Sequence, residues 1–474
     1  MKYTRKAFLR HVGLLSGSLV TGMGRGTGTP RIGTPGKRSN GNKSDNMIEI
    51  AEVSANFERE PLIRPFGFKG GFLREIWQTI ARLKSTNGHE GLGLCSQSVL
   101  WSDSSVFANH TESGGNALMY AISERALQMI EGEQFRAPVQ LQERILEELT
   151  AYAREITGEP DLRTTFVLNA LVGVDNALWM LYAHENDISQ FREMLPEQYR
   201  PSLSHRQPMV ASVPVISYGT PISEITQAVE EGYFFLKLKL GQPGTQQEML
   251  EKDMERITAI HNAIGDMRTP HTQSGRIPYY FDANGRYERK ETLLRLLDHA
   301  RNIGAFDQIE VMEEPFPEEL TIDVHDIPVR LAADESAHTD RDAIERIEMG
   351  YSAIALKSVA KTMSMTMKIA QAAYERGVPC FCADLTVNPV LVEWNKIVAA
   401  NVAPFPNLGM GLMETNGHQN YDNWERMRRY HPFPDAQWAN AENGVFELGD
   451  DYYEKSGGIF EIPKHYYDLV TVEE

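Results

Sequence analysis

The chain of 474 residues is long enough for two domains, or for one large barrel with an added lobe. Its 42% hydrophobic and 24% charged residues are ordinary for a soluble globular protein. Because 47 basic residues face 65 acidic ones, the net charge of -18 argues against a nucleic acid or an anionic membrane surface as a partner, and it is compatible with binding a metal cation.

Residues 1–46 differ in composition from the rest of the chain. A basic start precedes a short apolar stretch from Val12 to Val20, and a run rich in glycine, serine and threonine follows. This pattern predicts a signal peptide with a disordered linker, and the stretch is too short for a transmembrane helix. The run from Thr4 to Arg10 resembles a bacterial twin-arginine export signal, with Lys6 in place of the second arginine. We expect an exported, periplasmic protein; the alternative is a cytoplasmic protein with a disordered tail.

Residues 48–207 are predicted to form an α+β domain. Two strand-like runs come first, IEIAEVSANF and GHEGLGLCSQSVLW. Helical patterns follow from Pro138 to Thr157 and from Thr165 to Ala183. Between the two strand-like runs, Phe66 and Phe68 stand among glycines in IRPFGFKGGF, a pattern that is consistent with a surface turn.

Residues 208–414 repeat a unit made of a short β-rich run, a polar corner and a helical pattern. Eight such units predict a (β/α)8 TIM-type barrel and therefore an α/β fold class. An open doubly wound sheet is the weaker alternative, because no glycine-rich phosphate turn follows the first run. The eight runs are VPVISYGT, YFFLKLKLG, IPYYFDAN, QIEVMEEP, VRLAADES, YSAIALKS, VPCFCADLT and FPNLGMGLMET.

Residues 415–474 are aromatic and polar and contain no further βα unit. We expect this C-terminal segment to pack on the α+β domain and to complete it. The barrel alone would then supply the strand ends at which chemistry takes place.

Charged side chains recur at the C-terminal ends of the predicted strands, which meet at one mouth in such a barrel. Lys237 and Lys239 are two residues apart, so both point to the same face of their strand. Taken alone, the pair is also consistent with a strand edge whose lysines reach into water. The next four strands end in Asp282 and Asn284, in Glu313 and Glu314, in Asp334 and Glu335, and in Lys357.

These acidic groups and lysines suit one shared chemistry. Converging carboxylates repel one another unless a cation neutralises them, and ligands that are all oxygen atoms select a hard ion such as Mg²⁺. A general base must be a neutral amine at working pH, and both Lys237 and a divalent cation would favour that state at Lys239. Lys357 is four strands further round and would approach from the opposite side. Two bases on opposite faces of one carbon suit proton removal and return with inversion.

Five motifs stand in order on successive strands: Lys-x-Lys, Asp-x-Asn, Glu-Glu-Pro, Asp-Glu-Ser and a lysine on the next strand. In this order they resemble the enolase superfamily, and specifically its muconate lactonizing enzyme subgroup, which includes dipeptide epimerases. The resemblance extends from about Ile48 to Glu414. It includes ALVGVDNALWMLYA, residues 170–183, which is similar to the family's helix before the barrel. It implies a barrel with an N-terminal α+β capping domain.

The resemblance also implies roles for the residues at the strand ends. The Mg²⁺ ligands, for one ion per subunit, would be Asp282, Glu313 and Asp334. Lys239 and Lys357 would be the two acid/base catalysts, with Lys237 assisting Lys239 and helping to hold a substrate carboxylate. Asn284 and Glu335 would orient the ligands and lysines. Glu314 stands where the family often has glutamine, and we leave it out of the ligand set.

Substrate choice in this family comes from the ends of strands seven and eight and from a mobile loop of the lobe. Phe66 and Phe68 match the position of that loop and are expected to contact the substrate. Asp384 and Glu414 could bind a cationic group, although GLMETNG lacks the Asp-x-Asp with which alanyl-glutamate epimerases hold the substrate ammonium. Asp384 could equally cap the helix that begins at Asn388.

The expected function is that of an isomerase, a Mg²⁺-dependent racemase or epimerase. It would abstract the proton α to a carboxylate through an enediolate, on a dipeptide or an N-acyl amino acid. The alternative is a dehydratase or cycloisomerase of a sugar acid or cyclic acid on the same site. More remote alternatives are a barrel glycosidase that uses Glu313 and Asp384, and a binding protein without chemistry. The expected partner is a small carboxylate substrate, with no nucleic acid and no membrane insertion, and the family implies a homo-oligomer.

Overall fold

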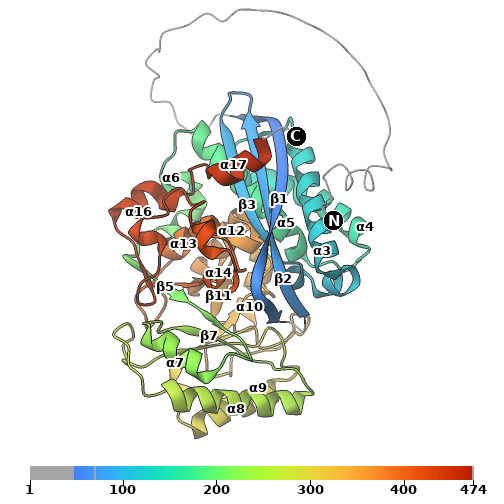
Figure 1. Ribbon diagram of the computed structural model, residues 1–474. Coiled ribbons are helices and arrows are strands. Elements are labelled where there is room, and N and C mark those ends of the chain that lie inside the picture. The colour runs from blue at the N-terminus through green and yellow to red at the C-terminus, as the bar shows by residue number, and fades with distance from the viewer. Residues whose placement is uncertain (1–46, 69–70, 472–474) are drawn as a thin grey trace, which may run out of the picture. The chain divides into compact units, whose positions relative to one another are not determined.

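The computed structural model describes residues 47–471, except residues 69 and 70. Within this part of the chain the strands form two β-sheets, one of four strands and one of ten, with helices packed on both (Figure 1). The predicted signal peptide and linker, residues 1–46, lie outside the described residues, so export stays a prediction.

The four-stranded sheet lies in the predicted α+β domain. Its strands are antiparallel and lie in the order β3-β2-β1-β4. β1 and β2 form a long hairpin, in which Phe66 pairs with Leu73 and Phe68 pairs with Gly71. Both phenylalanines are therefore part of a strand and not of a surface turn. The strands are β1 (Ile48–Phe68), β2 (Gly71–Ser85), β3 (Glu90–Gln97) and β4 (Gln134–Phe135).

One helix of this domain, α5 (Thr164–Glu185), lies at its centre. It packs on β2, β3 and α3, and its length and composition alone would allow it to cross a membrane. However, 94% of the apolar 18-residue stretch within this helix is buried inside the protein, as is usual for a core helix. The neighbouring helices are α2 (Val99–Ser102), α3 (Ser104–Ile130), α4 (Pro138–Thr157) and α6 (Phe191–Met194).

The ten-stranded sheet closes into an eight-stranded parallel barrel with one added strand. β5 (Met209–Val213) pairs with β13, the last barrel strand, whereas β6 (Val215–Ile216) pairs with β7. Only Pro214, which has no N–H for the ladder, separates β5 from β6, so the two act as one strand that joins both ends of the sheet. The others are β7 (Leu236–Lys239), β8 (Tyr279–Asp282), β9 (Ile309–Glu313), β10 (Leu331–Ala333), β11 (Ala353–Leu356), β12 (Cys380–Cys382), β13 (Gly411–Glu414) and the antiparallel β14 (Val445–Glu447).

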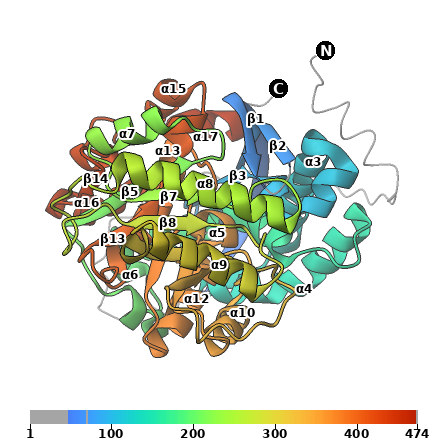
Figure 2. The ribbon, with the colours of Figure 1, turned by 90° about the horizontal axis from the view of Figure 1, so that it is seen from below.

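Helices surround this barrel, and α7, α8 and α9 lie next to one another on its outside (Figure 2). Thr245 and Thr339 begin α8 and α10 with capping boxes, which satisfy the first N–H groups of each helix. The helices are α7 (Ile222–Glu230), α8 (Gln246–Ile264), α9 (Lys290–Asn302), α10 (Asp340–Glu348), α11 (Ser358–Lys361), α12 (Met363–Glu375), α13 (Pro389–Asn401) and α14 (Gly417–Asn420).

The predicted fold class is confirmed, with one departure from regular (β/α)8 alternation. The connection from β9 to β10 contains no helix, although every residue in it is described. It contains Pro315, Pro317 and Pro328, and proline inside a helix removes an N–H donor and clashes with the preceding turn.

The C-terminal segment contacts both the lobe and the barrel. The Arg426 guanidinium lies 3.0 Å from the Glu60 carboxylate of β1, and α17 (Lys464–Thr471) packs on β1 and β2. On the other side, β14 adds to the barrel at β5. Its other helices are α15 (Trp424–Arg428) and α16 (Asp450–Lys455).

Candidate active site

The strand that carries Lys237 and Lys239 places both amines at the barrel mouth. The side chain of Lys237 is only 3% exposed, so it does not reach into water as an edge lysine would. Its Nζ donates to Glu313 at 2.8 Å and to Glu414 at 2.9 Å, and it lies 3.0 Å from Asp282. Burial opposes the charge, but these three carboxylates raise the pKa of Lys237 well above its usual range. Lys237 is therefore a fixed ammonium group.

Lys239 lies closer to the opening and has a smaller set of partners. Its Nζ donates to Asp282 and, at 2.8 Å, to the Oδ1 atom of Asn284. The other end of the Asn284 amide donates to Glu335 at 2.9 Å. Asn284 thus links this lysine to the acidic group at the end of β10.

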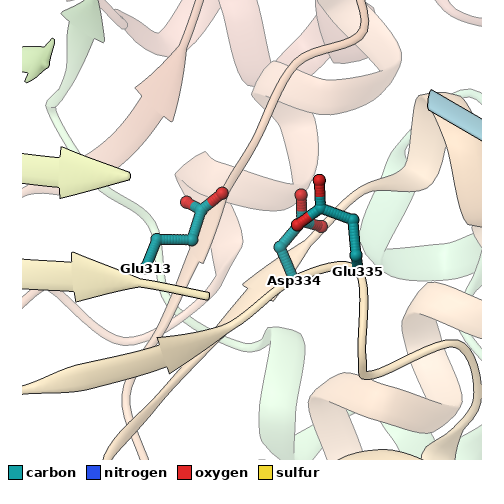
Figure 3. Close-up of side chains that lie close together, drawn as sticks. All are labelled: Glu313, Asp334 and Glu335. Atoms are coloured by element: carbon teal, nitrogen blue, oxygen red, sulfur yellow. The ribbon is translucent and has the colours of Figure 1, made fainter. Parts of the chain in front are cut away.

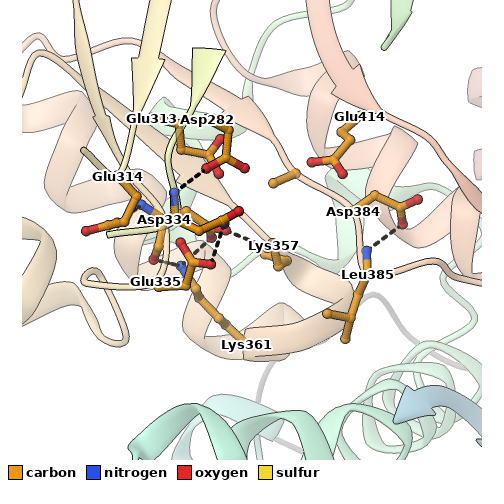
Figure 4. A network of polar contacts seen from close by, with 12 residues as sticks. Asp282, Glu313, Glu314, Asp334, Glu335, Lys357, Lys361, Asp384, Leu385 and Glu414 are labelled. Carbon is orange, nitrogen blue, oxygen red and sulfur yellow. Dashed lines mark hydrogen bonds and ion pairs between the residues drawn. The ribbon is translucent and has the colours of Figure 1, made fainter. Parts of the chain in front are cut away.

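Lys357 follows β11 and lies against the end of β10. Its Nζ donates to Asp334 Oδ2 at 2.6 Å, and it lies 4.4 Å from the centre of the Trp101 ring, which comes from the lobe. Burial opposes the charge of Lys357, but Asp334 outweighs it and raises the pKa of this lysine. A third lysine, Lys361, donates to the Asp334 carbonyl oxygen at 2.6 Å (Figure 4).

Three carboxylates at the ends of β9 and β10 form the candidate metal centre. Oxygen atoms of Glu313, Asp334 and Glu335 all lie within 4.8 Å of one another, and all three residues are buried (Figure 3). Donors that are all carboxylate oxygens fit a hard cation such as Mg²⁺. Two of these residues were predicted as ligands, whereas Glu335 was expected to orient them. The third predicted ligand, Asp282, here binds Lys237 and Lys239.

The charges of this cluster are unevenly balanced. Burial and the carboxylates of Asp282 and Asp334 raise the pKa of Glu313 well above its usual range. Burial would also raise the pKa of Asp334, but Lys357 and Lys361 outweigh it and lower that pKa. A cation between these groups would take over the compensation of charge that the lysines supply here.

Glu314 turns away from this cluster. Its Oε2 atom accepts hydrogen bonds from the backbone N–H of Asp334 at 2.8 Å and of Ser336 at 3.2 Å. Burial, followed by the nearby Glu335 carboxylate, raises the pKa of Glu314 to about 7. This side chain supports the loop after β10 and offers little to a metal.

The ends of β12 and β13 supply acceptors on the far side of the mouth. Asp384 accepts from the backbone N–H of Leu385 at 2.7 Å and of Asn416 at 2.8 Å, so both of its oxygens are engaged. It does not cap α13, because Asn388 does so through the N–H of Leu391. Glu414 accepts from Lys237 and, at 3.1 Å, from the side chain of Asn416.

Asn416 is a site residue that sequence reasoning missed. It is 3% exposed, and its Oδ1 atom, a hydrogen-bond acceptor, has no hydrogen-bond partner among the described residues. The signal available in the sequence was its spacing, since it stands two residues after Glu414. Its side chain lies beside Glu414 at the mouth of the barrel.

All predicted site residues except Asp282 and Glu313, which lie deeper, line one cavity. The free space in it is about 40 Å³, because the lysine amines lie directly against the carboxylates. A ligand that enters this cavity must therefore take the place of some of these contacts. The predicted residues that line it are Phe66, Phe68, Lys237, Lys239, Asn284, Asp334, Glu335, Lys357, Asp384 and Glu414, and the lobe adds Leu73, Ser98 and Trp101.

A larger cavity of about 350 Å³ lies elsewhere, among α13, α15 and the C-terminal segment. His418 and His431 line it, and burial lowers the pKa of each to about 4. None of the site lysines reaches it, so volume alone does not locate the chemistry.

Known proteins resemble the barrel region and, in fold, most of the chain. Residues 222–436 match the family model described as enolase C-terminal domain-like. A search of curated proteins gave no match. Solved structures give a TM-score of 0.58 at 17% identity for a mandelate racemase/muconate lactonizing protein from Herpetosiphon aurantiacus, with 85% of this chain and 96% of that chain covered.

Two epimerases are similar to the same extent. A dipeptide epimerase from Enterococcus faecalis V583, complexed with Mg and the dipeptide L-Leu-L-Tyr, gives a TM-score of 0.58 at 17% identity over 85% of this chain and 97% of that chain. The L-Ala-D/L-Glu epimerase from Bacillus subtilis gives a TM-score of 0.57 at 17% identity, with 79% of this chain and 92% of that chain covered. The match shows that residues 222–436 are enolase C-terminal domain-like, and most of the chain shares the fold of proteins of the mandelate racemase/muconate lactonizing type.

Proposed function

We propose that the protein is a Mg²⁺-dependent racemase or epimerase that removes and returns the proton α to a carboxylate. The observation that carries this proposal is the placement of Lys239 and Lys357. In the closed barrel β7 and β11 are four strands apart out of eight, so the two lysines face each other across the mouth. The acidic cluster at the ends of β9 and β10 lies between them in the strand order.

The metal would be held by Glu313 and Asp334, with a third carboxylate from Asp282 or Glu335. When bound, Mg²⁺ would draw electron density from the substrate carboxylate and stabilise the enediolate that forms when the α-proton leaves. Glu414, which is outside the proposed ligand set, would still hold Lys237 as an ammonium group, and Lys237 would face the same substrate carboxylate. The negative charge that develops would thus meet fixed positive groups that need no reorganisation.

The two lysines would divide the proton transfers between them. One neutral amine accepts the α-proton on its own face, and the ammonium form of the other donates a proton to the opposite face, which inverts the centre. In the absence of a cation Asp334 holds Lys357 in its charged form. A cation bound by Asp334 would weaken this hold, and Lys357 could then cycle between its two forms.

The substrate class that suits the remaining groups carries an N–H near its carboxylate. Glu414 and the Oδ1 of Asn416, which has no partner in the described part of the chain, are acceptors that line the cavity. The apolar side chains of Phe66 and Phe68 line its lobe side. A dipeptide or an N-acyl amino acid offers an N–H for the acceptors and a side chain for the phenylalanines. Two structurally similar proteins are dipeptide epimerases, which supports this choice.

The glycosidase alternative loses support at Asp384. Both oxygens of this carboxylate accept backbone N–H groups, so Asp384 is poorly placed to act as a nucleophile or a base with Glu313. It would also leave the buried lysines without a role.

The test is proton NMR in D₂O with Mg²⁺ and a library of dipeptides and N-acyl amino acids. We expect deuterium to enter one α-position while the second diastereomer appears. Lys239→Ala and Lys357→Ala should each slow inversion by at least about 100-fold. The exposed Lys252→Ala should not, and EDTA should stop the reaction until Mg²⁺ is restored.

Other results would redirect the assignment. No exchange in the whole library would contradict a dipeptide or N-acyl substrate, and sugar acids and cyclic acids would be tested next for dehydration or cycloisomerisation. Full inversion by either lysine variant would contradict the two-base mechanism itself.

A further inference from the structure

The lobe places an aromatic ring against one of the two candidate bases. The Nζ atom of Lys357 lies 4.4 Å from the centre of the Trp101 ring, within the range of a cation–π contact. Both residues line the cavity, and Lys357 and Trp101 are 2% and 4% exposed. The ammonium group thus lies between the Asp334 carboxylate, at 2.6 Å, and an indole face.

Trp101 is held in place from the core of the lobe. It belongs to α2, a single turn whose two ends are bound by one buried side chain, Asn169 of α5. The Oδ1 atom of Asn169 accepts from the N–H of Ser98 at 3.1 Å and from the hydroxyl of Ser102 at 3.1 Å. The hydroxyl of Thr165, also on α5, donates to the Ser102 carbonyl oxygen at 2.9 Å.

The segment that follows Lys357 is fixed by the same lobe helix. Asp175 of α5 accepts from the N–H of Ser364 at 2.9 Å and from its hydroxyl at 2.5 Å, at the start of α12. The indole of Trp179 donates to the same hydroxyl at 3.0 Å. Helix α5 therefore holds the ring above Lys357 and the chain beyond it.

Lys239 has different surroundings. Its partners are the polar side chains of Asp282 and Asn284, and among the described residues no aromatic ring lies over its amine. Its side chain is 11% exposed, against 2% for Lys357. The two candidate bases therefore differ in water access and in what orients them.

We propose that Trp101 is the positioning residue of Lys357, with α5 as its support, and that the lobe thereby sets the activity of one of the two bases. An indole face accepts no proton, so it can hold the ammonium form without competing for the proton that the lysine transfers. It also excludes water from one side of the amine. This inference rests on the proposed function for its catalytic meaning, whereas the contact itself can be tested without a substrate.

The first experiment measures the contact. The purified full chain is treated with formaldehyde and a mild reductant, and methylation of individual lysines is followed by mass spectrometry. We expect Trp101→Leu to raise the rate at Lys357 about 3-fold or more, since water and reagent gain access and the ring no longer holds the amine. Trp101→Phe should restore most of the protection, and Lys239 should react at the same rate in all three proteins.

The second experiment uses the stereochemistry of exchange in D₂O, starting from each epimer in turn. Lys357→Ala and Lys239→Ala first establish which epimer gives its proton to which lysine. Trp101→Leu should then slow exchange of the epimer that gives its proton to Lys357 by about 3- to 30-fold. Exchange of the epimer that gives its proton to Lys239 should change little. Trp101→Phe should recover much of the lost rate, and Asn169→Ala should show the same asymmetry.

The outcomes distinguish failure of the proposed Trp101–Lys357 contact from failure of the proposed function. An unchanged methylation rate at Lys357 in Trp101→Leu would overturn the inference, whatever the enzyme's reaction. Equal loss of exchange for both epimers, or a rise in KM alone, would also overturn it and make Trp101 a structural or substrate-contact residue. Absence of exchange in the wild-type protein would contradict the proposed function, and the methylation result would still decide whether Trp101 positions Lys357. Thermal unfolding and Mg²⁺ affinity of each variant show whether the fold and the metal centre are intact.

Discussion

At the scale of single residues, the site combines groups whose roles follow from their residue type and groups whose roles follow only from the fold. Lysines and acids at strand ends are visible in the sequence, because barrel strands end at one mouth. Which acids meet one another is not visible, since that depends on side-chain direction. Glu335 illustrates this, because its carboxylate lies within 4.8 Å of Glu313 and Asp334.

We predict that Glu335 contributes to metal affinity. Glu335→Gln should weaken Mg²⁺ binding by about 10- to 100-fold, because it removes one negative charge from the cluster. The matched control is Glu314→Gln, one strand away, whose carboxylate binds backbone N–H groups instead. Isothermal titration calorimetry with MgCl₂ measures both. Equal affinities for the two variants would contradict a ligand or near-ligand role for Glu335.

Other site residues could not have been found from their type alone. Trp101 comes from a different domain, and its place over Lys357 is set by Asn169 of α5. Lys361 lies one helical turn after Lys357, and only the short helix α11 brings its amine back to Asp334. Neither residue type is specific to catalysis, so sequence spacing gave no reason to select them.

At the scale of elements, apolar patterns predicted the regular segments well and failed where tertiary pairing decides. Helix α4 begins and ends where the pattern placed it, and the eight β-rich runs contain the barrel strands except β5, nearly all of which precedes the first run. Strand β2 was missed, because REIWQTIARL also spaces apolar residues as a helix does, and pairing with β1 and β3 makes it a strand. Helix α3 was missed as well; it contains a kink at Thr111 and two glycines.

The hairpin of β1 and β2 makes a second prediction, about the substrate side chain. Phe68 is 8% exposed and lines the cavity, whereas Phe72, on the same hairpin, is 63% exposed. Phe68→Ala should raise KM for substrates with apolar side chains by about 10-fold or more and change kcat less, because it removes apolar contact area and no reacting group. Phe72→Ala is the matched control and should leave KM unchanged. Steady-state kinetics on both variants would contradict the assignment if their KM values rose together.

At the scale of the whole molecule, the lobe, the barrel and the C-terminal segment are held together by buried polar contacts as well as by apolar packing. Asp175 of α5 is 2% exposed and binds the first turn of α12. Lys396 of α13 is 0% exposed, and its Nζ donates to the Trp438 carbonyl oxygen of the C-terminal segment at 2.6 Å. Such contacts fix the orientation of the parts, because leaving either partner unpaired in the interior is costly. The mouth of the barrel thereby receives residues from both parts.

The contact at Asp175 leads to a prediction about pH and stability. Burial raises the pKa of Asp175 from 3.8 to about 6, despite its hydrogen bonds to Ser364. Between about pH 4 and pH 6 the unfolded chain has lost this proton and the folded chain still holds it, so this group's contribution to stability is fully present below pH 4 and declines as the pH rises to 6. A difference of about 2 pKa units corresponds to at most about 3 kcal/mol.

Asp175→Asn removes this titration, so the Tm of the wild type relative to the variant should fall as the pH is raised from 4 to 6.5. Differential scanning fluorimetry across this range measures the difference. Asp298→Asn is the matched control, because its side chain is 69% exposed on α9, and its Tm should follow that of the wild type at every pH. If instead the Tm of the wild type rose relative to that of Asp175→Asn as the pH increased, the carboxylate of Asp175 would be charged in the folded protein. It would then bind the first turn of α12 as an ion. The contact between lobe and barrel at Asp175 would be strongest near neutral pH, where we expect the enzyme to work.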